Sequence, residues 1–229
     1  NIGYNLLGLK FLSDNINISK KKEKFLVKGE IECSENRIPQ EILSVLSKYN
    51  NIENAILSFK SDFSFNISKK FDTSDLKINS KVNLKEVKFN YDNKYIKKYL
   101  PNFDNNFKFS NHIINININN NNNILEGSGK FQIGDQIDKI RYNLDFNDEK
   151  INFDFNFDLN EMPIQIDQIN FSKKENIKAK LRVVGKNHNK KIKLKKISFK
   201  TQDSNFILDN IEFTKNYRIA NFEQIKLNY

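Results

Sequence analysis

Few residues in this 229-residue chain have side chains typical of catalytic or metal sites. There are two histidines, His112 and His188, and one cysteine, Cys33. Both histidines stand in polar sequence, so we expect each to be a solvated side chain rather than a catalytic base or a metal ligand. Two histidines and one cysteine are also too few for a typical structural zinc site. We therefore expect no enzymatic activity, no cofactor and no metal.

Three smaller features also have structural explanations. Acidic and amide residues alternate from Asp154 to Asn160 as in a calcium loop, but Leu159 and Gln165 stand where that loop needs Gly and Glu. The segment Gly127–Gly129 resembles a phosphate loop, yet it lacks the Lys and leads into strand-like sequence, so we interpret it as a bend or bulge. Cys33 has no neighbouring base and fits a small apolar residue at the end of a strand.

The strongest pattern in the sequence is an alternation of apolar and polar residues with a period of two. From Ile151 to Asn160 every odd position is apolar and every even position is Asn or Asp. A helix would spread these aromatic side chains around its axis, whereas a strand places all of them on one face. The alternation recurs along the chain between turn-like segments such as Gly134-Asp135 and Asn147-Asp148, which predicts consecutive antiparallel hairpins.

The apolar positions of this alternation are the candidate site residues. Burying one Phe is worth roughly 2–3 kcal/mol, so a stripe of aromatic side chains must meet protein or lipid. We expect the following side chains to line an apolar groove: Phe131, Ile133, Tyr142, Leu144, Phe146, Ile151, Phe153, Phe155, Phe157, Leu159, Ile164, Ile166, Leu181, Val183, Ile192 and Leu194.

Two segments interrupt the strand pattern and look helical. Residues 37–49 have Pro39 in the first turn and apolar residues at helical spacing. Residues 93–100 could form a short helical turn before Pro101. Because no linker is evident, we treat residues 1–229 as one β-groove segment. The chain begins at Asn1 without an initiator Met or a signal-like segment, so we expect it to be a piece of a longer protein.

Composition excludes several classes of protein. The 20 Phe and 8 Tyr are more than a disordered tail carries, and no apolar run reaches the roughly 18 residues of a membrane-spanning helix. The net charge of +10 comes from 38 basic and 28 acidic residues, but the lysines are scattered. Arginine, the usual reader of base edges, occurs only four times, so we expect no nucleic-acid partner.

Taken alone, the aromatic stripe fits the sealed core of a β-sandwich as well as a ligand groove. Sandwiches usually include long Greek-key connections, whereas this chain reads as consecutive hairpins with one apolar face. We therefore predict an all-β fold, in which an elongated, twisted antiparallel sheet curls into an open groove. One or two short helices accompany the sheet.

The sequence from about Leu100 onward resembles the AsmA-like family of bacterial envelope proteins. The resemblance lies in five segments: Leu100-Pro101, Leu125–Phe131, Ile140–Leu144, Ile151–Leu159 and Ile225–Tyr229. Members of that family are anchored in the inner membrane and extend through the periplasm as a long β-sheet curled into a groove. They are thought to carry phospholipid acyl chains toward the outer membrane.

The resemblance implies a function for this chain. It would be a periplasmic segment that binds phospholipid acyl chains in an apolar β-groove and supports lipid transport between the inner and outer membranes. Phospholipids would be its ligands, and contacts with both membranes, including the inner-membrane anchor, would be made by parts outside this sequence. The alternative is a structural or adhesive cell-surface β-protein, a sandwich or solenoid stalk, whose apolar core is sealed by protein.

Overall fold

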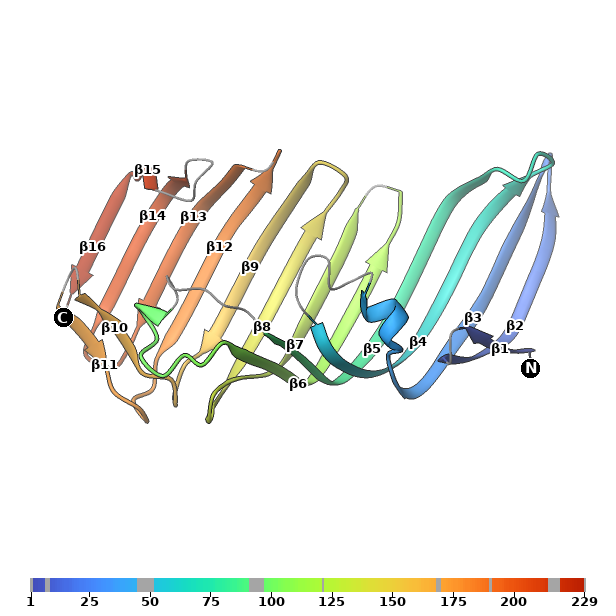
Figure 1. The fold of residues 1–229 in the computed structure, drawn as a ribbon. Helices are drawn as coiled ribbons and strands as arrows, with labels where there is room; N and C mark the ends of the chain where they lie inside the picture. The colour runs from blue at the N-terminus through green and yellow to red at the C-terminus, as the bar shows by residue number, and fades with distance from the viewer. Residues whose placement is uncertain are drawn as a thin grey trace. The chain divides into compact units, whose positions relative to one another are not determined.

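The chain is an all-β protein built on one antiparallel sheet. The computed structural model describes residues 2–6, 9–44, 52–90, 97–120, 122–167, 170–189, 191–213 and 219–228. Fourteen strands belong to the main sheet, which follows the chain order from β1 to β9 and continues with β12, β13, β14 and β15 (Figure 1). β16 pairs with β14, and β10 and β11 form a separate hairpin. The order has two ends, so the sheet is open, and the predicted all-β antiparallel fold is confirmed.

The strands vary from three to 18 residues in length. Their bounds are β1 Ile2–Leu6, β2 Leu9–Lys21, β3 Lys24–Arg37, β4 Ile52–Ser68, β5 Thr73–Asn90, β6 Asn106–Ile118, β7 Asn123–Ile133, β8 Gln136–Phe146, β9 Lys150–Asp158, β10 Ile164–Ile166, β11 Phe171–Lys173, β12 Lys180–His188, β13 Lys191–Lys200, β14 Asn205–Phe213, β15 Ile219–Asn221 and β16 Gln224–Asn228.

The chain divides into two compact units. Unit 1 comprises Asn1–Asn90 and Phe109–Gly127, and unit 2 comprises Tyr91–Lys108 and Ser128–Tyr229. All the predicted groove residues belong to unit 2.

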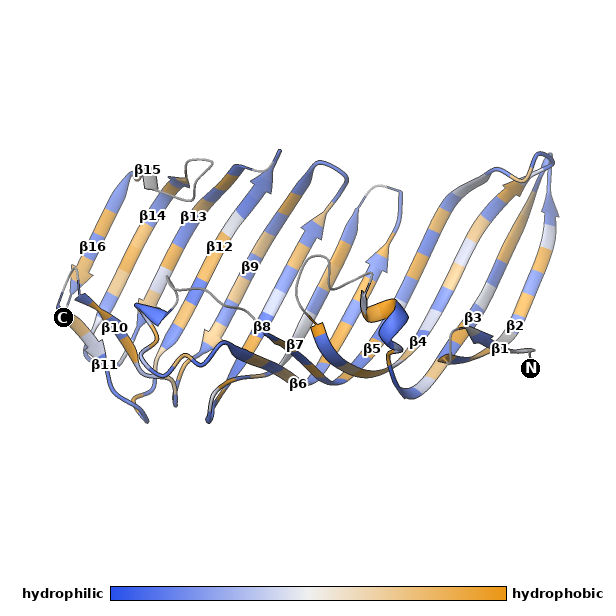
Figure 2. Cartoon of the chain, viewed as in Figure 1, coloured by the Kyte–Doolittle hydropathy of each residue, from blue (hydrophilic) through white to orange (hydrophobic). Residues whose placement is uncertain are grey.

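Alternating sequence and short polar turns explain the strands. Apolar and polar residues alternate along most of them (Figure 2). Between β8 and β9, the side-chain oxygen of Asn147 accepts hydrogen bonds from the backbone N–H groups of Glu149 and Lys150 at 3.1 and 2.9 Å. Between β7 and β8, Gly134 has a φ of 56°, the left-handed conformation that glycine adopts without strain.

A short helix that includes residues 40–44 interrupts the strands. The Pro39 carbonyl accepts hydrogen bonds from the N–H groups of Ile42 and Leu43 at 3.1 and 3.0 Å, and the Leu43 side chain is buried. The predicted start at residue 37 was wrong, because Arg37 still pairs with Ile56 in the β3–β4 ladder. Residues 45–49 of this prediction lie outside the described residues.

The second predicted helical segment, 93–100, is only partly described. Residues 93–96 lie outside the described residues, Lys97 is helical, and Lys98 and Tyr99 form a turn. Within the described part of the chain, no helix is long and apolar enough to cross a membrane.

Candidate functional site

The register of unit 2 aligns the predicted groove residues of β8, β9, β12 and β13 on one face of the sheet. Residues that stand directly opposite each other on neighbouring strands project from the same face. The pairings of β8, β9, β12, β13, β14 and β16 therefore build four rows across the sheet: Ile140–Phe157–Leu181–Phe199–Phe206–Leu227, Tyr142–Phe155–Val183–Ile197–Leu208–Ile225, Leu144–Phe153–Gly185–Leu194–Ile211 and Phe146–Ile151–Asn187–Ile192. We call this surface the apolar face of unit 2.

The predicted residues on β7 join the same surface at one end. The ring of Phe131 meets the ring of Phe157 edge to face, with 5.6 Å between the ring centroids. Phe131 and Ile133 are buried, as is Leu159, which follows β9. The N–H of Leu159 donates to the Ala179 carbonyl at 2.8 Å and extends the pairing of β9 and β12. At β7 and at the end of β9, this end of the apolar face is therefore closed to solvent.

The hairpin of β10 and β11 covers part of that closed end. The ring of Phe171 on β11 packs edge to face against Phe199 of the first row, with centroids 5.4 Å apart. The structure places Ile164 and Ile166 on β10, so these two predicted residues belong to the hairpin and not to the main sheet. The N–H of Gln165 donates to the Tyr99 carbonyl at 3.0 Å, which joins the hairpin to the segment before β6.

A buried carboxylate fixes the chain that leads into this hairpin. Asp138 is only 3% exposed and lies at an inward position of β8, two residues before Ile140. Its carboxylate accepts hydrogen bonds from the N–H groups of Asn160, Glu161 and Met162 at 2.7, 3.0 and 3.1 Å. Three such bonds satisfy a charge that would be costly to bury alone.

Lys173 fixes the hairpin from the other side. Its ammonium group donates to the carbonyls of Met162, Asn160 and Lys174 at 2.6, 3.2 and 3.2 Å, and the residue is 3% exposed. Burial lowers the pKa of Lys173, while the negative charge of Asp138 opposes that shift. Sequence analysis missed both residues, although each is a charged residue at an inward position of an alternating strand, and that signal would have found them.

The apolar face is more open at its fourth row and along the edge strand β16. Phe153 and Phe155 in its centre are half-buried, Ile151 in the fourth row is 41% exposed, and Ile225 and Leu227 on β16 are 45% and 42% exposed. Tyr142, in the same row as Phe155, is desolvated enough to raise the pKa of its phenol to about 12. The face is therefore apolar in its chemistry and partly accessible to solvent.

The opposite face of unit 2 is polar and carries ion pairs. The guanidinium of Arg182 binds both carboxylate oxygens of Asp154 at 2.6 and 3.1 Å, and this pairing raises the pKa of Arg182. Arg141 lies 3.5 Å from Asp158. The alternating acids of β9 are thus partners of arginines on the neighbouring strands, as expected for one face of a strand. Among the described residues, no three His, Cys, Asp or Glu side chains gather as a metal site requires.

Unit 1 has an apolar face of its own, on which Cys33 lies. Cys33 stands opposite Phe11 on β2 and Phe59 on β4, and its side chain is 1% exposed. Burial raises the pKa of its thiol, which fits the expected role as a small apolar residue. The same face includes two buried serines, Ser13 and Ser80.

The expectation that both histidines are solvated was wrong for His112. His112 is 2% exposed, and its ring packs edge to face against Phe109 with centroids 5.2 Å apart. Asn111 has a φ of 53°, which breaks the regular alternation of β6 and lets residues three positions apart meet. His188 is exposed, 4.0 Å from Glu149.

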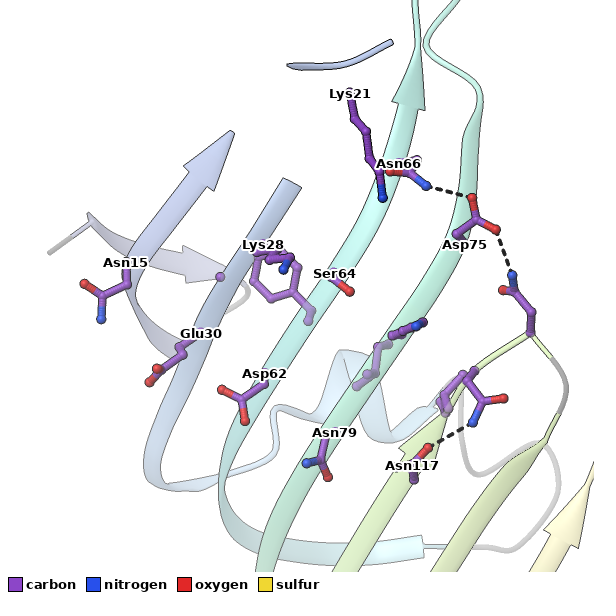
Figure 3. Close-up of a pocket in the computed structure, with 17 residues that line it drawn as sticks. Asn15, Lys21, Lys28, Glu30, Asp62, Ser64, Asn66, Asp75, Asn79 and Asn117 are labelled. Carbon is purple, nitrogen blue, oxygen red and sulfur yellow. Dashed lines mark hydrogen bonds between the residues drawn. The ribbon is translucent and has the colours of Figure 1, made fainter. Parts of the chain in front are cut away.

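A polar hollow of about 1030 Å³ lies on the other face of unit 1. Figure 3 shows Lys28 and Glu30 of β3 beside Asp62 of β4, with amide side chains around them. At its rim Asp75 accepts hydrogen bonds from Asn66 and Asn120 at 2.7 and 3.0 Å, and such bonds lower the pKa of Asp75. None of the predicted groove residues lines this hollow, because all of them belong to unit 2.

Comparisons with known proteins do not identify a family. Neither the protein-family models, nor the curated proteins, nor the solved structures contain a match to this chain. The resemblance to the AsmA-like family therefore stays a prediction from the sequence.

Proposed function

We propose that the chain binds the acyl chains of phospholipids along the apolar face of unit 2. The observation that carries this proposal is the alignment of apolar rows across β8, β9, β12, β13, β14 and β16, with side chains left partly open to solvent. A face of this kind is stabilised when apolar material covers it, because burial removes apolar surface from water. Acyl chains provide that material without requiring any specific hydrogen bond.

The dimensions of the rows suit an acyl chain. Six strands at a spacing of roughly 4.8 Å make a row about 24 Å long. The hydrocarbon core of a bilayer is about 30 Å thick, so the acyl chains of one leaflet span roughly half of that. Each methylene transferred from water contributes about 0.8 kcal/mol, so a chain that covers several strands gains enough to bind stably.

The wider role follows the family resemblance. The segment would support phospholipid transport between the inner and outer membranes of a cell envelope, in the periplasm. Phospholipids would move passively along the apolar face, and this segment would not need to catalyse a hydrolysis reaction to drive them. The contacts with the membranes and the inner-membrane anchor would belong to parts outside this sequence.

The alternative, a structural β-protein with a sealed core, is favoured by one observation. The β10–β11 hairpin already covers the end of the face at Phe199, as a protein lid would. If other protein covered the rest of the face in the same way, acyl chains would find no surface to bind.

Binding of a fluorescent fatty acid distinguishes the two functions. The test compares Phe155→Asp, which places a charge on the apolar face, with Asn156→Asp, which adds the same charge to the polar face between Arg141 and Arg182. We expect saturable binding by the parent chain and by Asn156→Asp, and strongly reduced binding by Phe155→Asp. Equal binding by the two variants, both folded, would contradict an acyl-chain site on this face.

A further inference from the structure

The polar face of unit 2 has a hollow of about 980 Å³ that the acyl-chain proposal does not use. It lies where β8 and β12 begin and where β9 and β13 end. The residues that line it include four lysines, Lys139, Lys178, Lys180 and Lys200. We call it the lysine hollow. Its volume is at the upper end of the range typical of small-molecule sites.

The register brings three of these lysines into one row. Lys139 pairs with Asp158 on β9, Asp158 pairs with Lys180 on β12, and Lys180 pairs with Lys200 on β13. Lys180 and Lys200 therefore stand directly opposite each other on one face. Like charges in that relationship destabilise a sheet, and an anion bound between them removes the repulsion.

The carboxylates around the hollow do not balance its positive charge. Two acids line it, Asp158 and Asp203, against four lysines. Asp158 also lies 3.5 Å from the guanidinium of Arg141, so its negative charge is shared with an arginine. The next acid along β9, Asp154, is held at 2.6 Å by Arg182. Both acids of β9 near the hollow thus lie beside arginines, and the four lysines of the hollow outnumber its two acids.

We propose that the lysine hollow binds a phosphate group. Ammonium groups bind phosphate oxygens through charge-assisted hydrogen bonds, and several of them can share one phosphate. The amides of Asn160 and Asn176 also line the hollow and offer neutral hydrogen-bonding groups. Thr201 lines it too, but its hydroxyl oxygen already accepts hydrogen bonds from the N–H groups of Asp203 and Ser204. The phosphate can come from a lipid headgroup or from a free phosphorylated molecule, because both present the same chemistry.

This site is separate from the apolar face. Lys180 and Lys200 project from the face opposite to their neighbours Leu181 and Phe199. Substitutions in the hollow should therefore leave fatty-acid binding unchanged. Failure of the phosphate proposal and failure of the acyl-chain proposal would then be seen in different measurements.

The test uses calorimetric titration of the full chain with two probes, inorganic pyrophosphate and vesicles of phosphatidylglycerol, with phosphatidylcholine vesicles as the neutral reference. The variant Lys180→Gln/Lys200→Gln removes two charges from the hollow. The matched control, Lys191→Gln/Lys195→Gln, removes two charges from β13 at residues that do not line it. Fluorescent fatty-acid binding is measured on each variant.

We expect saturable binding of the probe by the parent and by the control variant. The Lys180→Gln/Lys200→Gln variant should bind the probe with an affinity lower by about tenfold or more. Such a loss for pyrophosphate indicates a free phosphate as the ligand. The same loss with phosphatidylglycerol vesicles alone indicates a headgroup. Two results would overturn the proposal. If both double variants bound the probes with equally reduced affinity, the effect would come from net charge and not from the hollow. If the parent bound neither probe, the hollow would not be a phosphate site.

Discussion

Gly185 and Phe153 stand directly opposite each other on β12 and β9, and the Phe153 ring fills the space that a side chain on Gly185 would occupy. A Cβ atom at Gly185 would lie 2.6 Å from Cζ of Phe153, 2.8 Å from the carbonyl oxygen of Lys193 and 2.9 Å from Cδ2 of Leu194. The glycine lets the ring lie across the neighbouring strand, which makes the apolar face continuous from β9 to β13.

The substitution Gly185→Ala should destabilise the chain by about 1–3 kcal/mol, because the added methyl overlaps the ring and a backbone carbonyl that cannot easily move. The measurement is the free energy of unfolding in urea. Gly3→Ala is the control, since its Cβ would meet only Cδ2 of Leu12, at 3.9 Å. Similar free energies of unfolding for the two variants would show that the ring does not occupy the space beside Gly185.

The substitution Asp138→Ala should destabilise the chain by about 3–5 kcal/mol. It leaves three backbone N–H groups without their acceptor and removes the negative charge near the buried ammonium of Lys173. Hydrogen exchange should also become faster at the amides of residues 160–162. Asp135→Ala, at an exposed residue in the preceding turn, is the control. Unchanged exchange at 160–162 in Asp138→Ala would refute the anchoring role.

Lys173 gives the stability of the chain a dependence on alkaline pH. Its pKa is lower in the folded chain than the ordinary value of 10.5, because burial disfavours the charged form. Between the folded and unfolded pKa values the unfolded chain binds more protons, so stability rises as the pH increases through that interval and levels off above about 10.5.

The measurement compares the parent with Lys173→Met in urea unfolding from about pH 7 to pH 10. The variant lacks the titrating group, and we expect it to be less stable throughout, since three carbonyls lose their donor. The difference in free energy of unfolding should grow with pH, by about 1.4 kcal/mol for each pKa unit of the shift. A constant difference would contradict a lowered pKa at Lys173.

The repeating pattern of the sequence was enough to predict the sheet. Strict alternation from Ile151 to Leu159 fixed which side chains of β9 share a face, and the register then placed the alternating residues of β8 and β12 opposite them. Short polar turns join β7 to β8 and β8 to β9, and these strands pair in chain order. Local sequence was sufficient because each of these features depends on residues that are close in the chain.

The rest depends on contacts between distant residues or on broken alternation. The alternation of β8 marks Asp138 as an inward charge, but the N–H groups of residues 160–162 that bond it lie more than twenty positions away and could not be inferred from the nearby sequence. His112 is buried beside Asn111, whose positive φ marks a break in the alternation of β6, although the polar neighbours of His112 suggested a solvated side chain. The short segment Ile164–Ile166 alternates like a sheet strand, but only tertiary pairing with β11 shows that it belongs to a separate hairpin.

The most direct test of the acyl-chain site is mass spectrometry of lipids extracted from the purified chain. The parent is compared with Phe153→Asp/Phe155→Asp, which charges the apolar face, and with Asn152→Asp/Asn156→Asp, which adds the same charge to the polar face of β9. Circular dichroism confirms that each variant keeps its β-sheet. We predict stoichiometric phospholipid in the parent and the polar-face variant, and its loss from the apolar-face variant. Absence of phospholipid from all three would contradict the acyl-chain site and indicate a face that protein seals.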